Sequence, residues 1–100
     1  HCGMCRSWSG HVWASVMVPN DALKLTGEPK WFRSSGDAER GFCATCGTSL
    51  FWRADGADHV SVGMGTLDEP IGQQLERHIY TDFKGDYYDI ADGLPQEKSA

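Results

Sequence analysis

Hydrophobic and polar residues alternate over several short stretches of this chain, and each such stretch predicts a β-strand. In residues 11–18, the alternation puts small apolar residues on one face and Trp13 and Met17 on the other. Because both faces are apolar, we expect this strand to be central in its sheet. The same alternation predicts strands at residues 60–64 and 78–83.

Glycine, proline and aspartate punctuate the rest of the chain and separate further short elements. Residues 23–26 and 30–34 are strand candidates, and residues 40–53 predict a hairpin. We expect one helical turn capped by Asp21 and another in the tail, within residues 87–95. With twelve glycines and four prolines, the pattern indicates a mainly β fold of short antiparallel strands with few helical turns.

The predicted hairpin carries the strongest chemical signal, the sequence GFCATCGTSLFW at residues 41–52. Cys43 and Cys46 form a C-x-x-C pair, and two thiolates at this spacing can reach one metal ion when the backbone between them turns tightly. Gly47 follows at once and tolerates a positive φ, which lets backbone N–H groups point at the sulfurs. We therefore expect a zinc knuckle at the hairpin tip.

A second C-x-x-C pair, Cys2 and Cys5, lies within residues 1–10, which we expect to form a metal loop and a turn. Two such pairs that use all four cysteines predict a metal site. Two disulfides are the alternative in a secreted protein, but the sequence has no export signal. A redox C-x-x-C is a third possibility, but neither pair lies in a βαβ pattern. Zinc is the favoured interpretation, with Cys2, Cys5, Cys43 and Cys46 as ligands.

Length and charge narrow the classes of function. A chain of 100 residues predicts one small domain whose marginal core would gain from a metal staple. Nine basic and fourteen acidic residues are scattered along the chain and give a net charge of −5, which argues against nucleic acid or an anionic membrane surface as a partner. No stretch has the length of a membrane span. We expect a cytoplasmic protein.

The amino-acid sequences of four stretches point to one protein family more specifically than the cysteine spacing does. They are HCGMCRSWSG, GFCATCGTSLFW, MGTLDEP and HIYTDFKGDYYDIADGLP, in this order. Together they resemble the glutathione-dependent formaldehyde-activating enzyme family over nearly the whole chain. The resemblance implies a zinc-containing β-tent fold and a carbon–sulfur lyase activity. In that reaction formaldehyde joins the thiol of glutathione to give S-hydroxymethylglutathione.

The resemblance also assigns the cysteines. It implies that Cys43 and Cys46 belong to a structural zinc site, and that Cys2 and Cys5 are the last two cysteines of a catalytic C-x-C-x-x-C. The family's early C-x-C and its first catalytic cysteine have no counterpart in the sequence. We therefore expect residues 1–100 to be an N-terminally truncated domain with impaired activity.

Two interpretations of the cysteine pairs stay open at this point. Cys2 and Cys5 either form a catalytic half-site or join Cys43 and Cys46 in one four-cysteine structural zinc site. The second arrangement favours a noncatalytic zinc-stapled binding module rather than a lyase. A small thiol such as glutathione is the expected partner, and a homodimer is possible. The four histidines have no spacing typical of metal ligands, and we interpret them as ordinary polar residues, with His1 as a partial exception because it is adjacent to Cys2.

Overall fold

The computed structural model describes residues 1–100 and divides into two compact units. One unit comprises residues 14–71, here called the sheet unit. The other comprises residues 1–13 and 72–100, here called the terminal unit. Each unit has its own internal arrangement and is described by itself. That the chain folds as a single domain stays a prediction.

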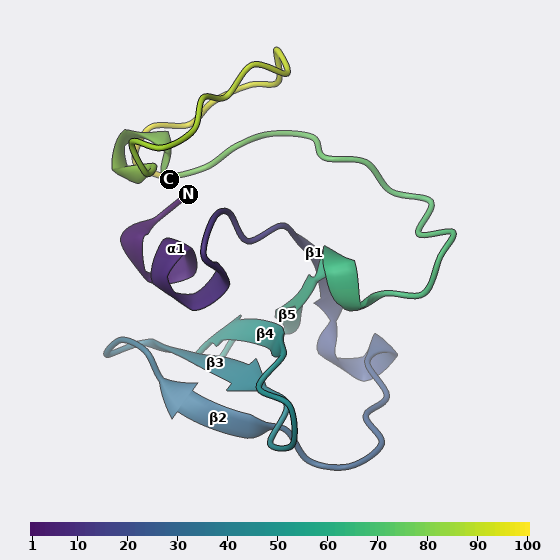
Figure 1. Ribbon diagram of the computed structural model, residues 1–100. Helices are drawn as coiled ribbons and strands as arrows, with labels where there is room; N and C mark the ends of the chain where they lie inside the picture. Colours follow the sequence, from purple (N-terminus) through teal and green to yellow (C-terminus); the bar gives the residue numbers. More distant parts are fainter. The chain divides into compact units, whose positions relative to one another are not determined.

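The sheet unit is built on one antiparallel sheet, which confirms the mainly β prediction (Figure 1). Its five strands lie in the order β1-β5-β4-β3-β2. Two short 3-10 turns, η1 and η2, follow β1 and β5. The elements are β1 (Ser15–Pro19), η1 (Asn20–Ala22), β2 (Lys30–Arg33), β3 (Ala38–Phe42), β4 (Ser49–Ala54), β5 (His59–Gly63) and η2 (Met64–Thr66).

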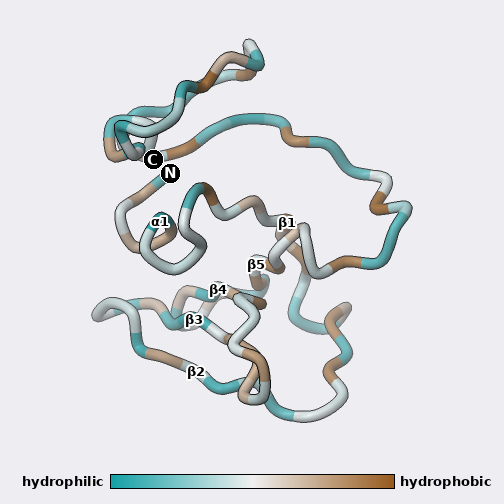
Figure 2. The backbone as a smooth tube through the Cα atoms, viewed as in Figure 1, coloured by the Kyte–Doolittle hydropathy of each residue, from teal (hydrophilic) through white to brown (hydrophobic).

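The core of the sheet unit forms on β4 and β5. Phe51, Val60 and Val62 are buried together, with 3–5% of their surface exposed. Hydrophobic positions at β5 appear in brown in Figure 2. Partly buried apolar residues pack around this cluster: Val16, Val18, Leu23, Trp31, Leu50 and Leu67. Burial of apolar surface in this cluster is the main stabilising term for the sheet.

A close aromatic stack crosses β2, β3 and β4. The rings of Trp31 and Phe51 lie stacked with centroids 5.9 Å apart, and the Arg53 guanidinium lies 3.8 Å from the Trp31 ring centroid. Gly41 lies beneath the two rings, where a Cβ atom would come within 3.0 Å of Trp31 and 3.1 Å of Phe51. A side chain at this position would therefore require the rings to shift by a few tenths of an ångström, whereas glycine fits without any shift.

Three sequence predictions for the sheet unit are wrong in detail. β1 is an edge strand rather than a central one, and Met17 on its second face is 61% exposed. Residues 23–26 form no strand, because Leu23 reaches the core from a loop. A single turn does form around Asp21, but its cap position is Pro19 and no side chain caps it.

The terminal unit holds little regular structure. It contains α1 (Gly3–Ser9) and η3 (Thr81–Phe83), and none of the buried hydrophobic residues of the chain lies in it. Residues 1–10 were expected as a loop and turn, but they form α1 because the Cys2 thiol accepts an N–H at the helix start. Helices without such a partner leave their first N–H groups unsatisfied.

The strand predicted at residues 78–83 is also wrong. Only one isolated bridge forms there, between His78 and Gln96, before the backbone turns through Tyr80 at φ 54° into η3. A positive φ at Tyr80 cannot continue a strand. The helical turn expected in the tail, within residues 87–95, does not form either.

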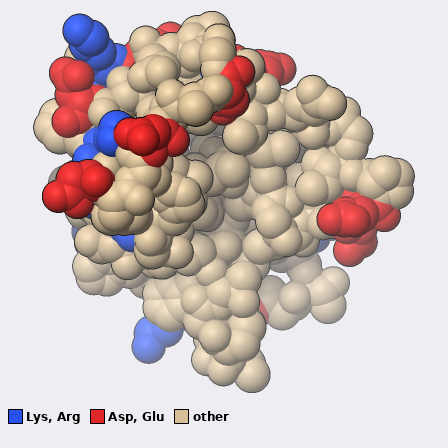
Figure 3. Space-filling model, turned by 45° about the horizontal axis from the view of Figure 1, so that its top comes forward, with Lys and Arg blue, Asp and Glu red and all other residues tan.

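Two surface properties complete the description. On the face drawn in Figure 3, acidic and basic side chains form small separate groups among uncharged residues. None of the helices combines the length and the apolar character that crossing a bilayer requires.

Candidate functional site

The C-x-x-C pair of the sheet unit lies at the tip of the β3–β4 hairpin, as the sequence predicts. The Cys43 thiol accepts the N–H of Cys46 at 3.5 Å, and the Cys43 carbonyl accepts the N–H of Gly47 at 2.8 Å. Gly47 has φ +77°, a conformation that returns the chain into β4 and that L-residues with a side chain rarely adopt. The glycine prediction for this turn is confirmed.

The environment of this turn favours a thiolate. Backbone N–H groups of Cys46 and Thr45, together with the Cys46 thiol, lower the pKa of Cys43 from 9.0 to about 7. The Cys46 sulfur lies 2.9 Å from the Thr48 hydroxyl oxygen. Thiolate is the form of cysteine that binds metal and attacks electrophiles. This turn is therefore chemically prepared for either task near neutral pH.

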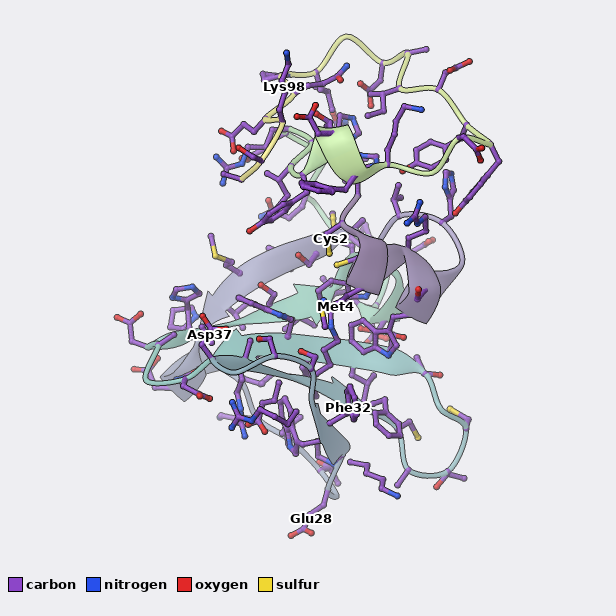
Figure 4. The ribbon with its side chains drawn as sticks, turned by 90° about the vertical axis from the view of Figure 1, so that its left-hand side faces the viewer. Cys2, Met4, Glu28, Phe32, Asp37 and Lys98 are labelled. Carbon is purple, nitrogen blue, oxygen red and sulfur yellow. The ribbon has the colours of Figure 1, made fainter.

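The C-x-x-C pair of the terminal unit lies in the first turn of α1, where Figure 4 labels Cys2. The Cys2 thiol accepts the N–H of Cys5 at 3.3 Å, and the Cys2 carbonyl accepts the N–H of Arg6 at 2.9 Å. Both thiols are half-buried. Local hydrogen bonding thus brings Cys2 and Cys5 together within one turn.

The donor set of each pair fits part of a zinc site. None of the four cysteines forms a disulfide, so all four sulfurs are present as thiols or thiolates. The structure contains no group of three or more His, Cys, Asp or Glu side chains arranged to hold a metal ion. Each pair therefore supplies two thiolate positions of the four that tetrahedral zinc takes. In both pairs the N–H of the second cysteine points at the first sulfur, and the lowered pKa of Cys43 favours the thiolate form at the hairpin tip.

Sequence reasoning missed a cluster of polar side chains in the terminal unit. His1 Nε2 lies 2.8 Å from His78 Nδ1, and His1 Nδ1 lies 2.6 Å from the Tyr88 hydroxyl. On its other side, His78 Nε2 lies 2.7 Å from an oxygen of Asp92. These partners are separated by 14 to 87 positions, so no local spacing could reveal them.

The same cluster lines a pocket of about 350 Å³ within the terminal unit. The pocket mixes imidazole, phenol, carboxylate and apolar groups, and its lining residues are His1, His11, Val12, His78, Tyr88, Asp89, Ile90, Ala91 and Asp92. Burial raises the pKa of the Tyr88 phenol, while the N–H of Leu94 and the His78 ring lower the pKa of Asp92. The pocket therefore holds a protonated phenol and an ionised carboxylate near neutral pH.

A comparison with models of known protein families shows to which family the chain belongs. The model of the glutathione-dependent formaldehyde-activating enzyme family matches residues 1–83. The chain belongs to this family. Membership suggests a formaldehyde-activating, glutathione-related function. A search of curated proteins finds no match.

The part of the chain that the formaldehyde-activating family model matches includes both cysteine pairs. It also includes His1 and His78, whereas Tyr88 and Asp92 lie beyond it. The resemblance seen in the sequence is thus confirmed, and glutathione is the thiol partner that the family implies.

Proposed function

We propose that this protein is a carbon–sulfur lyase that joins formaldehyde to the thiol of glutathione. The family match over residues 1–83 is the observation that carries the proposal. The antiparallel sheet supports a β-tent fold for the domain. The noncatalytic binding module is not favoured by any feature of either cysteine turn.

The proposed reaction forms one bond and needs no oxidant. The sulfur of glutathione attacks the formaldehyde carbon, a carbon–sulfur bond forms, and the π bond of the carbonyl opens. The thiol proton ends on the former carbonyl oxygen, giving S-hydroxymethylglutathione. The reverse reaction breaks the same carbon–sulfur bond and releases both reactants.

The two cysteine pairs take different roles in this proposal. Cys43 and Cys46 would hold a structural zinc ion, a role supported by the lowered pKa of Cys43 and by the closed turn around it. Cys2 and Cys5 would contribute two thiolates to a catalytic zinc site. Zinc bound there supplies Lewis acidity and stabilises a substrate thiol as thiolate at neutral pH. The half-buried Cys2 and Cys5 side chains would hold this site at the start of α1.

Exchange spectroscopy on the purified, zinc-loaded protein tests the activity. We expect the protein to accelerate exchange between free formaldehyde and S-hydroxymethylglutathione, and Cys2→Ser to reduce this acceleration at least about tenfold. Glu28→Gln, on an exposed loop of the sheet unit, serves as the control and leaves the rate unchanged. Wild-type exchange no faster than the uncatalysed reaction contradicts the proposal.

Metal stoichiometry tests the division of roles. If the pairs hold separate zinc ions, the double variant Cys2→Ser with Cys5→Ser keeps the metal bound at Cys43 and Cys46. The reciprocal variant, Cys43→Ser with Cys46→Ser, keeps the metal bound at Cys2 and Cys5. If the four cysteines share one ion, either double variant loses all zinc, and the catalytic role of Cys2 and Cys5 is wrong because no position stays open for substrate.

A further inference from the structure

Three hydrogen bonds link four side chains of the terminal unit in a row: Tyr88, His1, His78 and Asp92. The three donor–acceptor distances are 2.6, 2.8 and 2.7 Å, which are short for hydrogen bonds in proteins. We call this row the imidazole chain. The His78 side chain at its centre is only 12% exposed.

The two ends of the imidazole chain set its direction. Asp92 is ionised and can only accept, so His78 Nε2 carries a hydrogen and donates to it. In a neutral imidazole the other nitrogen then accepts, which requires His1 Nε2 to donate to His78 Nδ1. His1 Nδ1 is left as an acceptor and takes the hydrogen of the Tyr88 hydroxyl. One set of tautomers satisfies all three hydrogen bonds.

Both partners of His1 are themselves held by the backbone. The N–H and C=O of His78 bond to Pro95 and Glu97 at 2.9 and 2.8 Å. An oxygen of Asp92 accepts the N–H of Leu94 at 3.1 Å. The Tyr88 carbonyl accepts the Lys84 ammonium at 2.7 Å. These backbone contacts therefore fix the two groups that His1 meets: the Tyr88 hydroxyl as a donor and the His78 Nδ1 atom as an acceptor.

His1 connects this fixed segment to the cysteine turn. Its main-chain nitrogen donates to the Ile79 carbonyl at 3.2 Å, and the next residue is Cys2, whose thiol begins α1. The terminal unit contains none of the buried hydrophobic residues that could position this turn by packing. Hydrogen bonds therefore contribute to holding the turn in one place, together with partly buried ring contacts such as that between Trp8 and Trp13.

We propose that the imidazole chain is a positioning device for the Cys2 and Cys5 thiolates, with His78 and Tyr88 as positioning residues. This inference rests on the proposed function, which places a metal at these two thiolates. Tyr88 and Asp92 orient the His1 ring from opposite ends of the chain, and the oriented ring fixes the backbone from which Cys2 extends. Removal of the Tyr88 hydroxyl or of the Asp92 carboxylate leaves the Cys2 and Cys5 thiolates present but no longer fixed in position.

Nitrogen-15 spectra of the imidazole rings test the chain itself. At about pH 8, where ordinary imidazoles are neutral, we expect His1 and His78 each to show a single tautomer with the hydrogen on Nε2. His59, whose side chain is 44% exposed and whose Nδ1 lies 3.1 Å from an oxygen of Asp58, provides the comparison. A mixture of tautomers at both His1 and His78 would overturn the inference.

Cobalt titration tests the positioning role. In a background with Cys43→Ser and Cys46→Ser, the thiolate-to-cobalt band reports only Cys2 and Cys5. There we expect Tyr88→Phe and His78→Phe each to weaken cobalt binding about tenfold, as loss of an outer hydrogen-bond partner typically does. Asp89→Asn lines the same pocket without joining the chain and should change nothing.

A reciprocal background separates positioning from general loss of structure. With Cys2→Ser and Cys5→Ser, cobalt reports Cys43 and Cys46, and Tyr88→Phe should have no effect there. The positioning role of the imidazole chain is wrong if Tyr88→Phe weakens cobalt binding equally in both backgrounds, or does not weaken it in the first. Either result leaves the proposed lyase function untouched. Absence of any cobalt band in the first background before Tyr88 or His78 is changed refutes instead the proposed role of Cys2 and Cys5.

Discussion

The two C-x-x-C turns of this protein share their local hydrogen bonds but differ in what supports them. In each, the first thiol accepts the N–H of the second cysteine. In each, the carbonyl of the first cysteine accepts the N–H of the residue after the second, at 2.9 Å from Arg6 and at 2.8 Å from Gly47. The motif therefore determines the turn in both places.

The residue after the second cysteine decides what the turn becomes. Arg6 continues into α1, whereas Gly47 adopts φ +77° and sends the chain back as β4. The Gly47 turn belongs to the unit that contains the buried cluster around Phe51, whereas the Cys2 turn belongs to the unit that contains the imidazole chain and no buried hydrophobic residue. The same two-thiol turn thus occurs both in a unit with a buried apolar cluster and in a unit without one.

The largest effect should come from removing apolar packing from the core of the sheet unit. Phe51→Ala deletes the largest buried side chain of the core cluster and should lower the free energy of unfolding by about 3–5 kcal/mol. Urea denaturation measures the change. Phe32→Ala removes a ring of the same size that is 62% exposed on β2 (labelled in Figure 4), and should cost under about 0.5 kcal/mol. If both variants lost the same free energy of unfolding, Phe51 would not belong to the core of the sheet unit.

Glycine-to-alanine changes should act with opposite signs in the two turns. Gly47→Ala forces a side chain into the left-handed region and should destabilise the protein by about 1–2 kcal/mol. Gly3→Ala lies in α1, where its Cβ meets Arg6 at an ordinary 3.6 Å, and should stabilise by about 0.5 kcal/mol. Thermal unfolding of both variants checks the comparison, which fails if the two changes have the same sign.

The pKa of Cys43 predicts how the stability of the protein and the reactivity of the hairpin turn depend on pH. Its folded pKa of about 7 is depressed from 9.0, so the thiolate adds to stability above pH 9, and this contribution is lost as the pH falls through 7. Alkylation at Cys43, followed by peptide mass spectrometry against pH, should show a midpoint near 7. Cys46→Ala should raise this midpoint, because one hydrogen bond to the thiolate is lost. A wild-type midpoint near 9 would contradict the thiolate assignment.

The smallest effect should come from the hydroxyl beside each second cysteine. Thr48→Val removes the oxygen 2.9 Å from the Cys46 sulfur and should cost under about 1 kcal/mol. Ser7 has the same offset from Cys5 and is exposed, so Ser7→Ala should change stability by less than about 0.5 kcal/mol. Urea midpoints compare the two variants. A larger loss at Ser7 than at Thr48 would reverse the expected order.

The parts of the fold predicted from sequence are those that local rules control. Alternation locates β5, and the glycine after Cys46 locates the hairpin tip. Alternation does not reveal which strand lies at an edge, because Met17 is apolar yet faces solvent. Nor does it reveal where strand pairing stops, since His78 begins an alternating stretch that forms an isolated bridge to Gln96 and no regular strand.

The site was predicted only as far as the cysteines. Spacing identified both pairs, because each turn closes within five residues. The helix that follows Cys2 was not predicted because cysteine is not a common helix cap, although the Cys2 thiol caps α1 here. The imidazole chain could not be predicted because His1 meets partners 77 and 87 positions away.

The contact between Gly41 and the Trp31 and Phe51 rings has an evolutionary consequence. Because a Cβ at position 41 would come within 3.0 Å of Trp31 and 3.1 Å of Phe51, a side chain there requires one of the rings to shift or to become smaller. Positions 31, 41 and 51 should therefore change together among descendants of this sequence, although they lie on three different strands. A lineage with alanine at position 41 should carry a smaller residue than tryptophan at position 31, or than phenylalanine at position 51.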